Sequence, residues 1–269
     1  MDTTIIYVAV LLITGVIAGF SSGLIGVGGC FLMVPVQFWL LSTMGMDSTL
    51  AIRVAFGTSL AVALPTALSG TLGHHRRHAV LWNAAVPIGI AAVIGALLGG
   101  TIAANAPGEI LRILFGIVVL VVSVRMIVDL PIKAPAENRS RMPAWIVTGF
   151  GVGILSGLVG MGGGIVMVPI MVIALGFSMH QAVGTSSACI LFSSAGGVIA
   201  YIANGLGVPG LPPLSVGYVE LIPWAILVAT TIPFAQVGVR AAHRLPARKL
   251  RRVFAVVMAG IGVAMLFAL

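Results

Sequence analysis

The same glycine-rich string occurs twice in the chain, as GFSSGLIGVGGCFLMVPV at 19–36 and as GILSGLVGMGGGIVMVPI at 153–170. Ten of the eighteen aligned pairs are identical, at a constant displacement of 134 positions. An internal repeat constrains architecture before any other feature, because each copy is expected to build the same substructure. The sequence therefore predicts two similar membrane halves, residues 1–129 and 144–269, joined by a linker at 130–143.

The composition places both halves in a lipid bilayer. Charged residues make up 7% of the 269 residues, whereas 59% are hydrophobic. A soluble domain carries roughly a quarter charged residues, so this chain lacks the side chains to cover a surface that faces water. The formal net charge of +8 does not indicate a nucleic-acid partner, because most basic residues lie in short gaps between apolar runs, as orientation signals do. We predict a multi-pass protein of the cell (inner) membrane.

Each half contains five apolar segments. Crossing about 30 Å of hydrocarbon takes about 20 helical residues. The sequence predicts an all-α integral membrane protein with about eight to ten transmembrane helices, some of them short or broken at the glycine motifs. The segments lie at 5–25, 28–45, 50–72, 80–104 and 109–129, and again at 144–159, 162–177, 180–203, 217–239 and 249–268.

The charges of equivalent loops predict that the two halves are inverted. The gap at 73–78 is basic, but its counterpart at 203–210 carries no charge. The next pair is reversed, because 103–108 is neutral whereas 240–252 holds six basic residues. Basic loops favour the cytoplasm, so equivalent loops are expected on opposite sides. The linker at 130–143 is then cytoplasmic, and both chain ends are extracytoplasmic.

The glycine strings predict interrupted helices. A membrane tolerates such breaks where the backbone is buried in protein or lines a wet cavity, and matching breaks in two inverted halves indicate a transport site. Backbone N–H groups at a helix start favour an anion. Two full helices or two half-helices both fit the strings, and simple close packing of small residues is the alternative role. The candidate substrate-binding residues here are Gly26, Gly28, Gly29, Cys30, Gly160, Gly162, Gly163 and Gly164.

A second repeated motif, Gly-Thr-Ser, supplies hydroxyl groups in the third segment of each half. These hydroxyls could bind an oxyanion without the cost of a buried charge, or could bond back to their own helix carbonyls. The candidates are Thr58, Ser59, Thr185, Ser186 and Ser187.

Arg53 and His180 occupy equivalent positions just before those motifs. A basic group near a helix start opposes the helix dipole, so each is expected to have a partner, either a lipid phosphate or a substrate anion at the mouth of the pathway. The histidine-rich run at 74–78 coincides with the basic loop, and we expect no metal site there. The sequence shows no cofactor motif and no nucleophile–base pair, so we predict no cofactor and no enzyme activity.

The strings GLIGVGGCFLMVP and GLVGMGGGIVMVP, each followed by an Ala-x-Gly-Thr-Ser segment, resemble the TauE/SafE family of membrane permeases over essentially the whole chain. The resemblance implies transport of sulfur-containing anions, namely sulfite, organosulfonates or thiosulfate. It places the family's glycine motifs on the glycines named above and its Gly-Thr-Ser motifs on Gly57-Thr58-Ser59 and Gly184-Thr185-Ser186. Cys30 departs from the pattern, because the second copy has Gly164 in its place.

These observations lead to one hypothesis with two alternatives. The hypothesis is a secondary transporter of small sulfur anions that works by alternating access, with a proton as the candidate coupling ion and a homo-oligomer as a candidate assembly. The alternatives are a channel-like anion facilitator and a non-transporting membrane scaffold or assembly factor.

Overall fold

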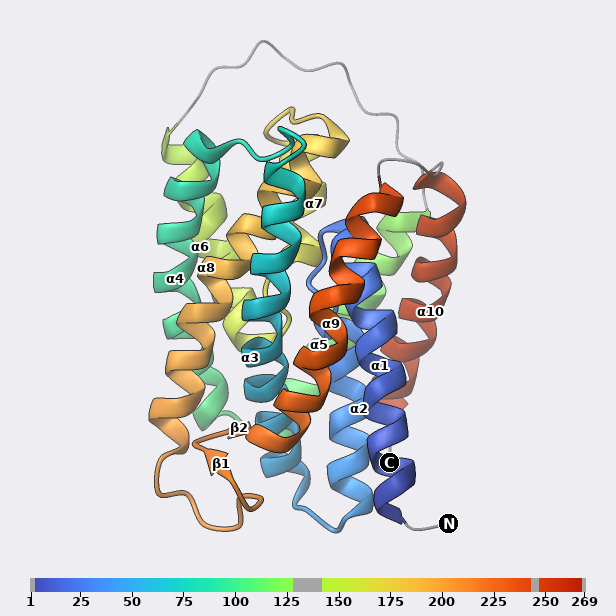
Figure 1. The fold of residues 1–269 in the computed structure, drawn as a ribbon. Coiled ribbons are helices and arrows are strands. Elements are labelled where there is room, and N and C mark those ends of the chain that lie inside the picture. The colour runs from blue at the N-terminus through green and yellow to red at the C-terminus, as the bar shows by residue number, and fades with distance from the viewer. Residues whose placement is uncertain (1–2, 128–141, 243–246, 268–269) are drawn as a thin grey trace.

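The computed structural model describes residues 3–127, 142–242 and 247–267, and these residues form a bundle of helices (Figure 1). The ten segments predicted from the sequence are all helical, which confirms an all-α integral membrane protein. The first half forms α1 (Thr3–Ile25), α2 (Cys30–Thr43), α3 (Ser48–His75), α4 (Trp82–Asn105) and α5 (Gly108–Ile127). The second half forms α6 (Met142–Val159), α7 (Gly164–Ile173), α8 (Met179–Gly205), α9 (Leu221–Ala242) and α10 (Ala247–Phe267).

The start of the ninth segment differs from the prediction. Two short antiparallel strands, β1 (Ser215–Val216) and β2 (Val219–Glu220), precede α9. Gly217 in the turn between them has a φ of +56°, a left-handed conformation that favours glycine. The chain therefore stays extended up to residue 220, and the helix predicted from 217 begins four residues later.

Six of the described helices, α1, α3, α4, α6, α8 and α9, are long and apolar enough to cross a membrane. By contrast, α2 has 14 residues and α7 has 10. At about 1.5 Å per residue these two extend only about 21 and 15 Å, less than the roughly 30 Å of a hydrocarbon core. Each glycine string therefore joins a long helix to a half-length helix, which is neither the pair of full helices nor the pair of half-helices expected from the sequence.

The two halves start from opposite ends of the bundle (Figure 1). Helix α1 begins at the lower end in that view, and α2 returns to the same end. Helix α6 begins at the upper end, and α7 returns there. The basic turn after α3 and the end of α9 both lie at the upper end, whereas the β1–β2 hairpin lies at the lower end. Most of the predicted linker, residues 130–141, lies outside the described residues.

Glycine-on-backbone contacts join the first helix of each half to the fourth helix of the other half. A methyl group built on Gly19 of α1 would lie 2.6 Å from Thr231 Cα in α9. One built on Gly23 would lie 2.0 Å from the carbonyl oxygen of Ala235, also in α9. In α6, Gly153 and Gly157 meet α4 in the same way. Such close approach requires residues without a side chain. The packing role that the sequence allowed for these glycines is therefore the one that the structure shows.

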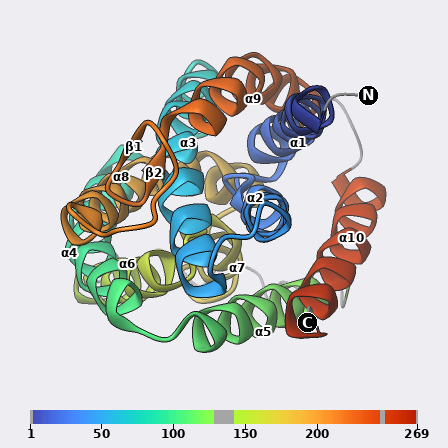
Figure 2. The same ribbon diagram turned by 90° about the horizontal axis from the view of Figure 1, so that it is seen from below.

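The remaining helices enclose the centre. Helices α3 and α8 pack against each other, and α5 packs against α10. Seen along the bundle (Figure 2), the half-length helices α2 and α7 lie toward the middle, surrounded by the longer helices. The two glycine strings are thereby brought to the interior.

Candidate functional site

The candidate site is centred on two short loops, residues 26–29 between α1 and α2 and residues 160–163 between α6 and α7. Each loop holds three glycines with φ between +64° and +84°. Residues with a side chain rarely adopt this conformation, so both loops require glycine for backbone reasons alone. The six residues are Gly26, Gly28, Gly29, Gly160, Gly162 and Gly163.

The two loops touch each other. A methyl group built on Gly28 would lie 3.7 Å from the carbonyl oxygen of Met161, and one built on Gly164 would lie 2.6 Å from the carbonyl oxygen of Gly26. The side chain of Ile190, from α8, is near both loops and is buried. The starts of α2, at Cys30, and of α7, at Gly164, therefore converge on one place. The structure brings together all the glycine candidates, whose substrate role stays a prediction.

The two threonine candidates hold the halves together. The backbone N–H of Glu220 donates to Thr58 Oγ1 at 2.9 Å, and the backbone N–H of Leu81 donates to Thr185 Oγ1 at 3.1 Å. Glu220 directly precedes α9 and Leu81 is the N-cap of α4. Each threonine thus accepts from a backbone N–H that precedes the fourth helix of the opposite half, as a capping group does at a helix start.

A Thr58→Val substitution is expected to lower the free energy of unfolding by about 1–3 kcal/mol, because it leaves the buried N–H of Glu220 without an acceptor. Thr58→Ser keeps the hydroxyl and should retain most of the stability. Thermal unfolding of the detergent-solubilised variants measures the difference. A Thr58→Val protein that is as stable as the unsubstituted one but no longer transports would show that the hydroxyl serves the substrate instead.

The serine candidates also make protein contacts, mainly at the first loop. Ser59 Oγ accepts from Gln37 Nε2 at 3.0 Å. Ser186 Oγ donates to the carbonyl oxygen of Gly26 at 3.0 Å, and Ser187 Oγ donates to a carbonyl of its own helix at 2.9 Å. For Ser187, bonding back to its own helix, the alternative that the sequence left open, is what the structure shows.

Cys30 differs from its counterpart Gly164 in more than size. Its thiol lies 3.6 Å from the carbonyl oxygen of Ser59 and 3.7 Å from that of Gly28. A thiol is a weak donor, so these contacts direct the S–H group toward backbone carbonyls of α3 and of its own loop. Cys30 therefore places a thiol at the first loop, whereas at the equivalent position of the second loop Gly164 lets the Gly26 carbonyl and Ile190 approach closely.

Three buried polar side chains were not among the site residues predicted from the sequence. Ser156 Oγ, Ser194 Oγ and Gln37 Oε1 have no hydrogen-bond partner within the described part of the chain. Ser156 was visible in the sequence as an identical position of the repeat, but Ser194 and Gln37 have no equivalent polar residue in the other half. The repeat, which guided the choice of candidates, could not reveal them.

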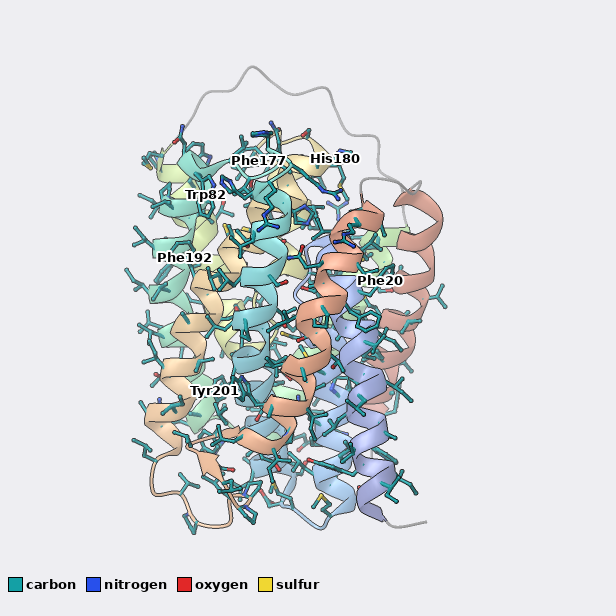
Figure 3. All side chains as sticks on the ribbon, viewed as in Figure 1. Phe20, Trp82, Phe177, His180, Phe192 and Tyr201 are labelled. Atoms are coloured by element: carbon teal, nitrogen blue, oxygen red, sulfur yellow. The ribbon has the colours of Figure 1, made fainter. Side chains whose placement is uncertain are left out.

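Arg53 and His180 are not part of the central site. Arg53 donates to the carbonyl oxygen of Ala106 at 2.9 Å and to Tyr218 Oη at 3.3 Å. Helix α3 begins at the lower end of the bundle, so Arg53 ties the end of α4 and the β1–β2 turn together there. His180 is exposed near the start of α8, at the upper end (Figure 3). The two residues lie at opposite ends, and Arg53 has protein partners where a lipid phosphate or a substrate anion was expected.

The histidine-rich loop contributes to packing. His74 is buried, and its Nε2 lies 3.1 Å from the carbonyl oxygen of Gly23. Tyr201 makes the corresponding contact in the other half, where its hydroxyl donates to the carbonyl oxygen of Gly157 at 3.0 Å. The part of the chain that the structure describes contains no group of three His, Cys, Asp or Glu side chains that could hold a metal ion.

The sequence also matches a known protein family. A family model described as sulfite exporter TauE/SafE matches residues 11–265. The chain belongs to the TauE/SafE family. This confirms the resemblance carried by the doubled glycine and Gly-Thr-Ser motifs. No solved structure matches the chain.

The relatives of this family member are named as transporters. A probable membrane transporter protein of Haemophilus influenzae is 27% identical over 260 residues, covering 96% of this chain and 98% of that protein. One of Methanocaldococcus jannaschii is 30% identical over 259 residues, covering 95% and 94%. A third, YunE of Bacillus subtilis, is 29% identical over 216 residues, covering 73% and 78%.

Glu220, whose backbone N–H donates to Thr58, also carries a buried acidic side chain. It directly precedes the membrane-spanning part of α9, and burial raises the pKa of its carboxyl from 4.5 to about 7. The folded protein therefore favours the protonated form. The raised pKa lowers the free energy of unfolding. This loss is absent below pH 4.5, grows as the Glu220 carboxyl ionises in the unfolded chain, and is complete above pH 7.

Glu220→Gln should therefore raise the unfolding temperature relative to the unsubstituted protein, and the gain should be larger at pH 8 than at pH 5. Unfolding curves at both pH values measure it. Glu109→Gln, at an exposed position in the first turn of α5, is the matched control. A gain from Glu220→Gln that is equal at both pH values would contradict the assignment of the raised pKa.

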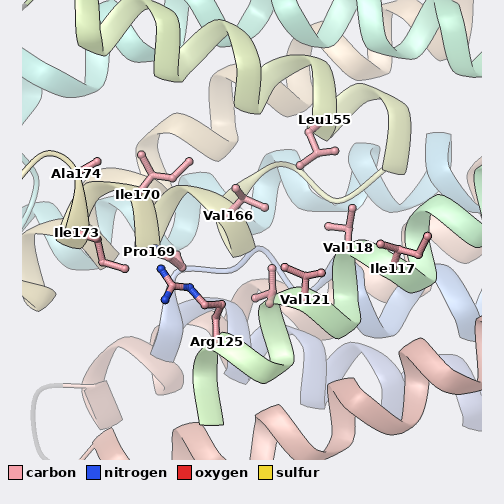
Figure 4. A pocket seen from close by; sticks show the side chains of 11 residues that line it. Ile117, Val118, Val121, Arg125, Leu155, Val166, Pro169, Ile170, Ile173 and Ala174 are labelled. Atoms are coloured by element: carbon pink, nitrogen blue, oxygen red, sulfur yellow. The ribbon is translucent and has the colours of Figure 1, made fainter. Parts of the chain in front are cut away.

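A separate cavity of about 380 Å³ lies between α5, α6 and α7 (Figure 4). Its lining is aliphatic except for Arg125, whose guanidinium reaches toward Pro169. Such a lining suits apolar chains, and Arg125 is the one polar side chain in it. In this member of the TauE/SafE family, the glycine loops are the better candidate for the functional site. The lining residues are Ile117, Val118, Val121, Val122, Arg125, Leu155, Val166, Pro169, Ile170, Ile173 and Ala174.

Proposed function

We propose that this protein is a secondary transporter that moves small sulfur-containing oxyanions across the cell membrane. The observation that carries the proposal is the convergence of two helix starts. Helices α2 and α7 begin at glycine loops that touch in the interior. The first N–H groups of a helix have no partner within it, and the helix dipole places partial positive charge at the same end. Two such ends at one buried place favour an anion.

The arrangement of the halves supports alternating access. The first helices of the two halves start from opposite ends of the bundle, and the glycine contacts of α1 with α9 match those of α6 with α4. We infer that residues 1–129 and 144–269 are inverted repeats that rearrange around the loops. Arg76 and Arg77 follow α3, and Arg240 lies in the last turn of α9, so all three belong to the upper end of the bundle. Because basic loops favour the cytoplasm, we infer that this end is cytoplasmic and that both chain ends are extracytoplasmic.

The substrate class rests on the family description. Members described as sulfite exporters would move sulfite, and related organosulfonates or thiosulfate share its oxyanion chemistry. An anion that leaves a cell with a negative interior gains about 2.3 kcal/mol per charge per 100 mV, so export needs no further drive. Uptake would need a coupled ion such as a proton. The proposed role is transport, with no chemical change of the substrate.

The test is flux through the purified full-length protein in liposomes. Radiolabelled sulfite, thiosulfate, methanesulfonate or sulfate is added to the external solution, with and without a proton gradient. Initial rates of uptake are measured over a range of anion concentrations. Saturable uptake with counterflow is expected for at least one sulfur anion.

The alternatives give different results in the same experiment. Flux that does not saturate and shows no counterflow would identify a channel-like facilitator. If no sulfur anion moves and none raises the unfolding temperature, the proposed substrate class is wrong, and a scaffold or assembly role becomes the better explanation.

A further inference from the structure

Two serines from different helices lie next to the second glycine loop. Ser156 is in α6 and Ser194 is in α8. A methyl group built on Gly163 would lie 3.4 Å from Ser156 Cβ, and one built on Gly162 would lie 3.2 Å from Ser194 Oγ. The two side chains therefore reach the loop from different helices, next to the start of α7.

Both hydroxyls are buried and unpaired. Ser156 is 1% exposed and Ser194 is 0% exposed, and within the described residues neither Oγ has a hydrogen-bond partner. A serine inside a helix commonly donates to a carbonyl of the preceding turn. Ser187 and Ser193, in the same helix as Ser194, do so. A buried hydroxyl without a partner destabilises the fold, so two of them at one loop need another explanation.

The first loop shows no such pair of free hydroxyls. Ala67 stands where the repeat offset of 127 would place the counterpart of Ser194. The Cys30 thiol is directed to carbonyls, and the Ser59 hydroxyl already accepts from Gln37. The unpaired atom on that side, Gln37 Oε1, is an acceptor, which would repel an anion. Within the described residues, buried hydroxyls without a partner therefore lie at the second loop and not at the first.

We propose that the hydroxyls of Ser156 and Ser194, together with the first N–H groups of α7, bind the oxygens of the substrate's sulfur group. This inference rests on the proposed function and makes it specific to one loop. Helix α7 begins at Gly164, so the N–H groups of Gly164 and Ile165 have no partner within the helix. The hydroxyls and these N–H groups together supply four neutral donors.

The absence of a counter-charge selects the class of anion. Among the nearest neighbours of Gly160, Gly162, Gly163 and Gly164 there is no charged side chain. The cost of burying an ion without a counter-charge is large and rises with its charge. The site should therefore bind monoanions such as alkanesulfonates or bisulfite, and should reject the sulfate dianion.

The experiment measures equilibrium binding of methanesulfonate and of sulfate to the purified full-length protein in detergent. Ser156→Ala and Ser194→Ala are each expected to weaken methanesulfonate binding about tenfold or more, because each removes a hydrogen bond to an ionised group. Neither should lower the unfolding temperature without ligand, since neither breaks a bond of the empty protein. Ser22→Ala, at the position of α1 equivalent to Ser156, is the matched control and should bind normally.

The outcomes separate this inference from the proposed function. Normal binding by both variants, or equal weakening by Ser22→Ala, would overturn the subsite and leave transport intact. Sulfate binding as tight as methanesulfonate binding would overturn the selection for monoanions. A failure of the unsubstituted protein to bind any sulfur anion would instead overturn the proposed function.

Discussion

A Gly157→Ala substitution is expected to lower the unfolding temperature of the protein by about 2–12 °C. The added methyl would lie 2.4 Å from the carbonyl oxygen of Ala96 and 2.5 Å from the backbone nitrogen of Gly100. Backbone atoms of a packed helix cannot rotate away, so α6 and α4 must separate. Overpacking typically costs about 1–3 kcal/mol, and each kcal/mol corresponds to about 2–4 °C for a chain of this size.

Gly151→Ala provides the matched control. Gly151 is in the same helix, and a methyl built there meets nothing within 4 Å. Because alanine favours a helix over glycine by about 1 kcal/mol, this variant should be as stable as the unsubstituted protein or slightly more so. Thermal unfolding in one detergent compares the two. Equal losses of stability in the two variants would mean that the close contact between α6 and α4 is not the cause of the loss.

The glycine string combines two functions that its sequence does not separate. Its first part, exemplified by Gly19 and Gly23, packs a helix against a backbone, whereas Gly26, Gly28 and Gly29 form a loop with positive φ. Duplication identified the string and composition placed it in a membrane. Helix α1 ends at Ile25, between the two parts of the string. Which glycines pack against α9 depends on the tertiary structure, so the sequence alone could not show it.

The repeated Gly-Thr-Ser motif identified the threonine candidates, but their long-range hydrogen bonds could not be predicted from the sequence. Thr58 bonds the backbone of Glu220, 162 residues away, and Thr185 bonds Leu81, 104 residues away. Recurrence of Gly-Thr-Ser showed that these residues matter in both halves. A substrate and a neighbouring helix start both require an oxygen at that position, so the sequence alone could not choose between them.

The residues that break the repeat were harder to find. Ser194 and Gln37 stand opposite apolar positions, so comparison of the two halves gave them no weight. Their significance comes from the lack of a partner in the folded protein, which depends on packing around each atom. The repeat predicts the same framework in both halves, but a substrate does not need the same binding groups from each half.

Gly164→Ala is expected to leave the protein folded and to reduce the initial transport rate about tenfold or more. The backbone of Gly164 is helical, as the first residue of α7, so alanine is not strained there. Its methyl would, however, lie 2.6 Å from the carbonyl oxygen of Gly26 and 2.4 Å from Ile190 Cδ1. Ile190 can change rotamer, but the carbonyl belongs to the other loop. The loops must therefore move apart, and a change of about 1.4 kcal/mol in the barrier is enough for tenfold.

Cys30→Ala is the matched control, because it removes side-chain atoms at the equivalent position of the first loop. It gives up only weak contacts of the thiol with the carbonyls of Ser59 and Gly28, so transport should stay within about twofold. The measurement is initial uptake into liposomes at matched protein content, together with unfolding temperature. Normal transport by Gly164→Ala would place the site away from the junction of the loops. A greater loss from Cys30→Ala would make the thiol, rather than the second loop, the group that contacts the substrate.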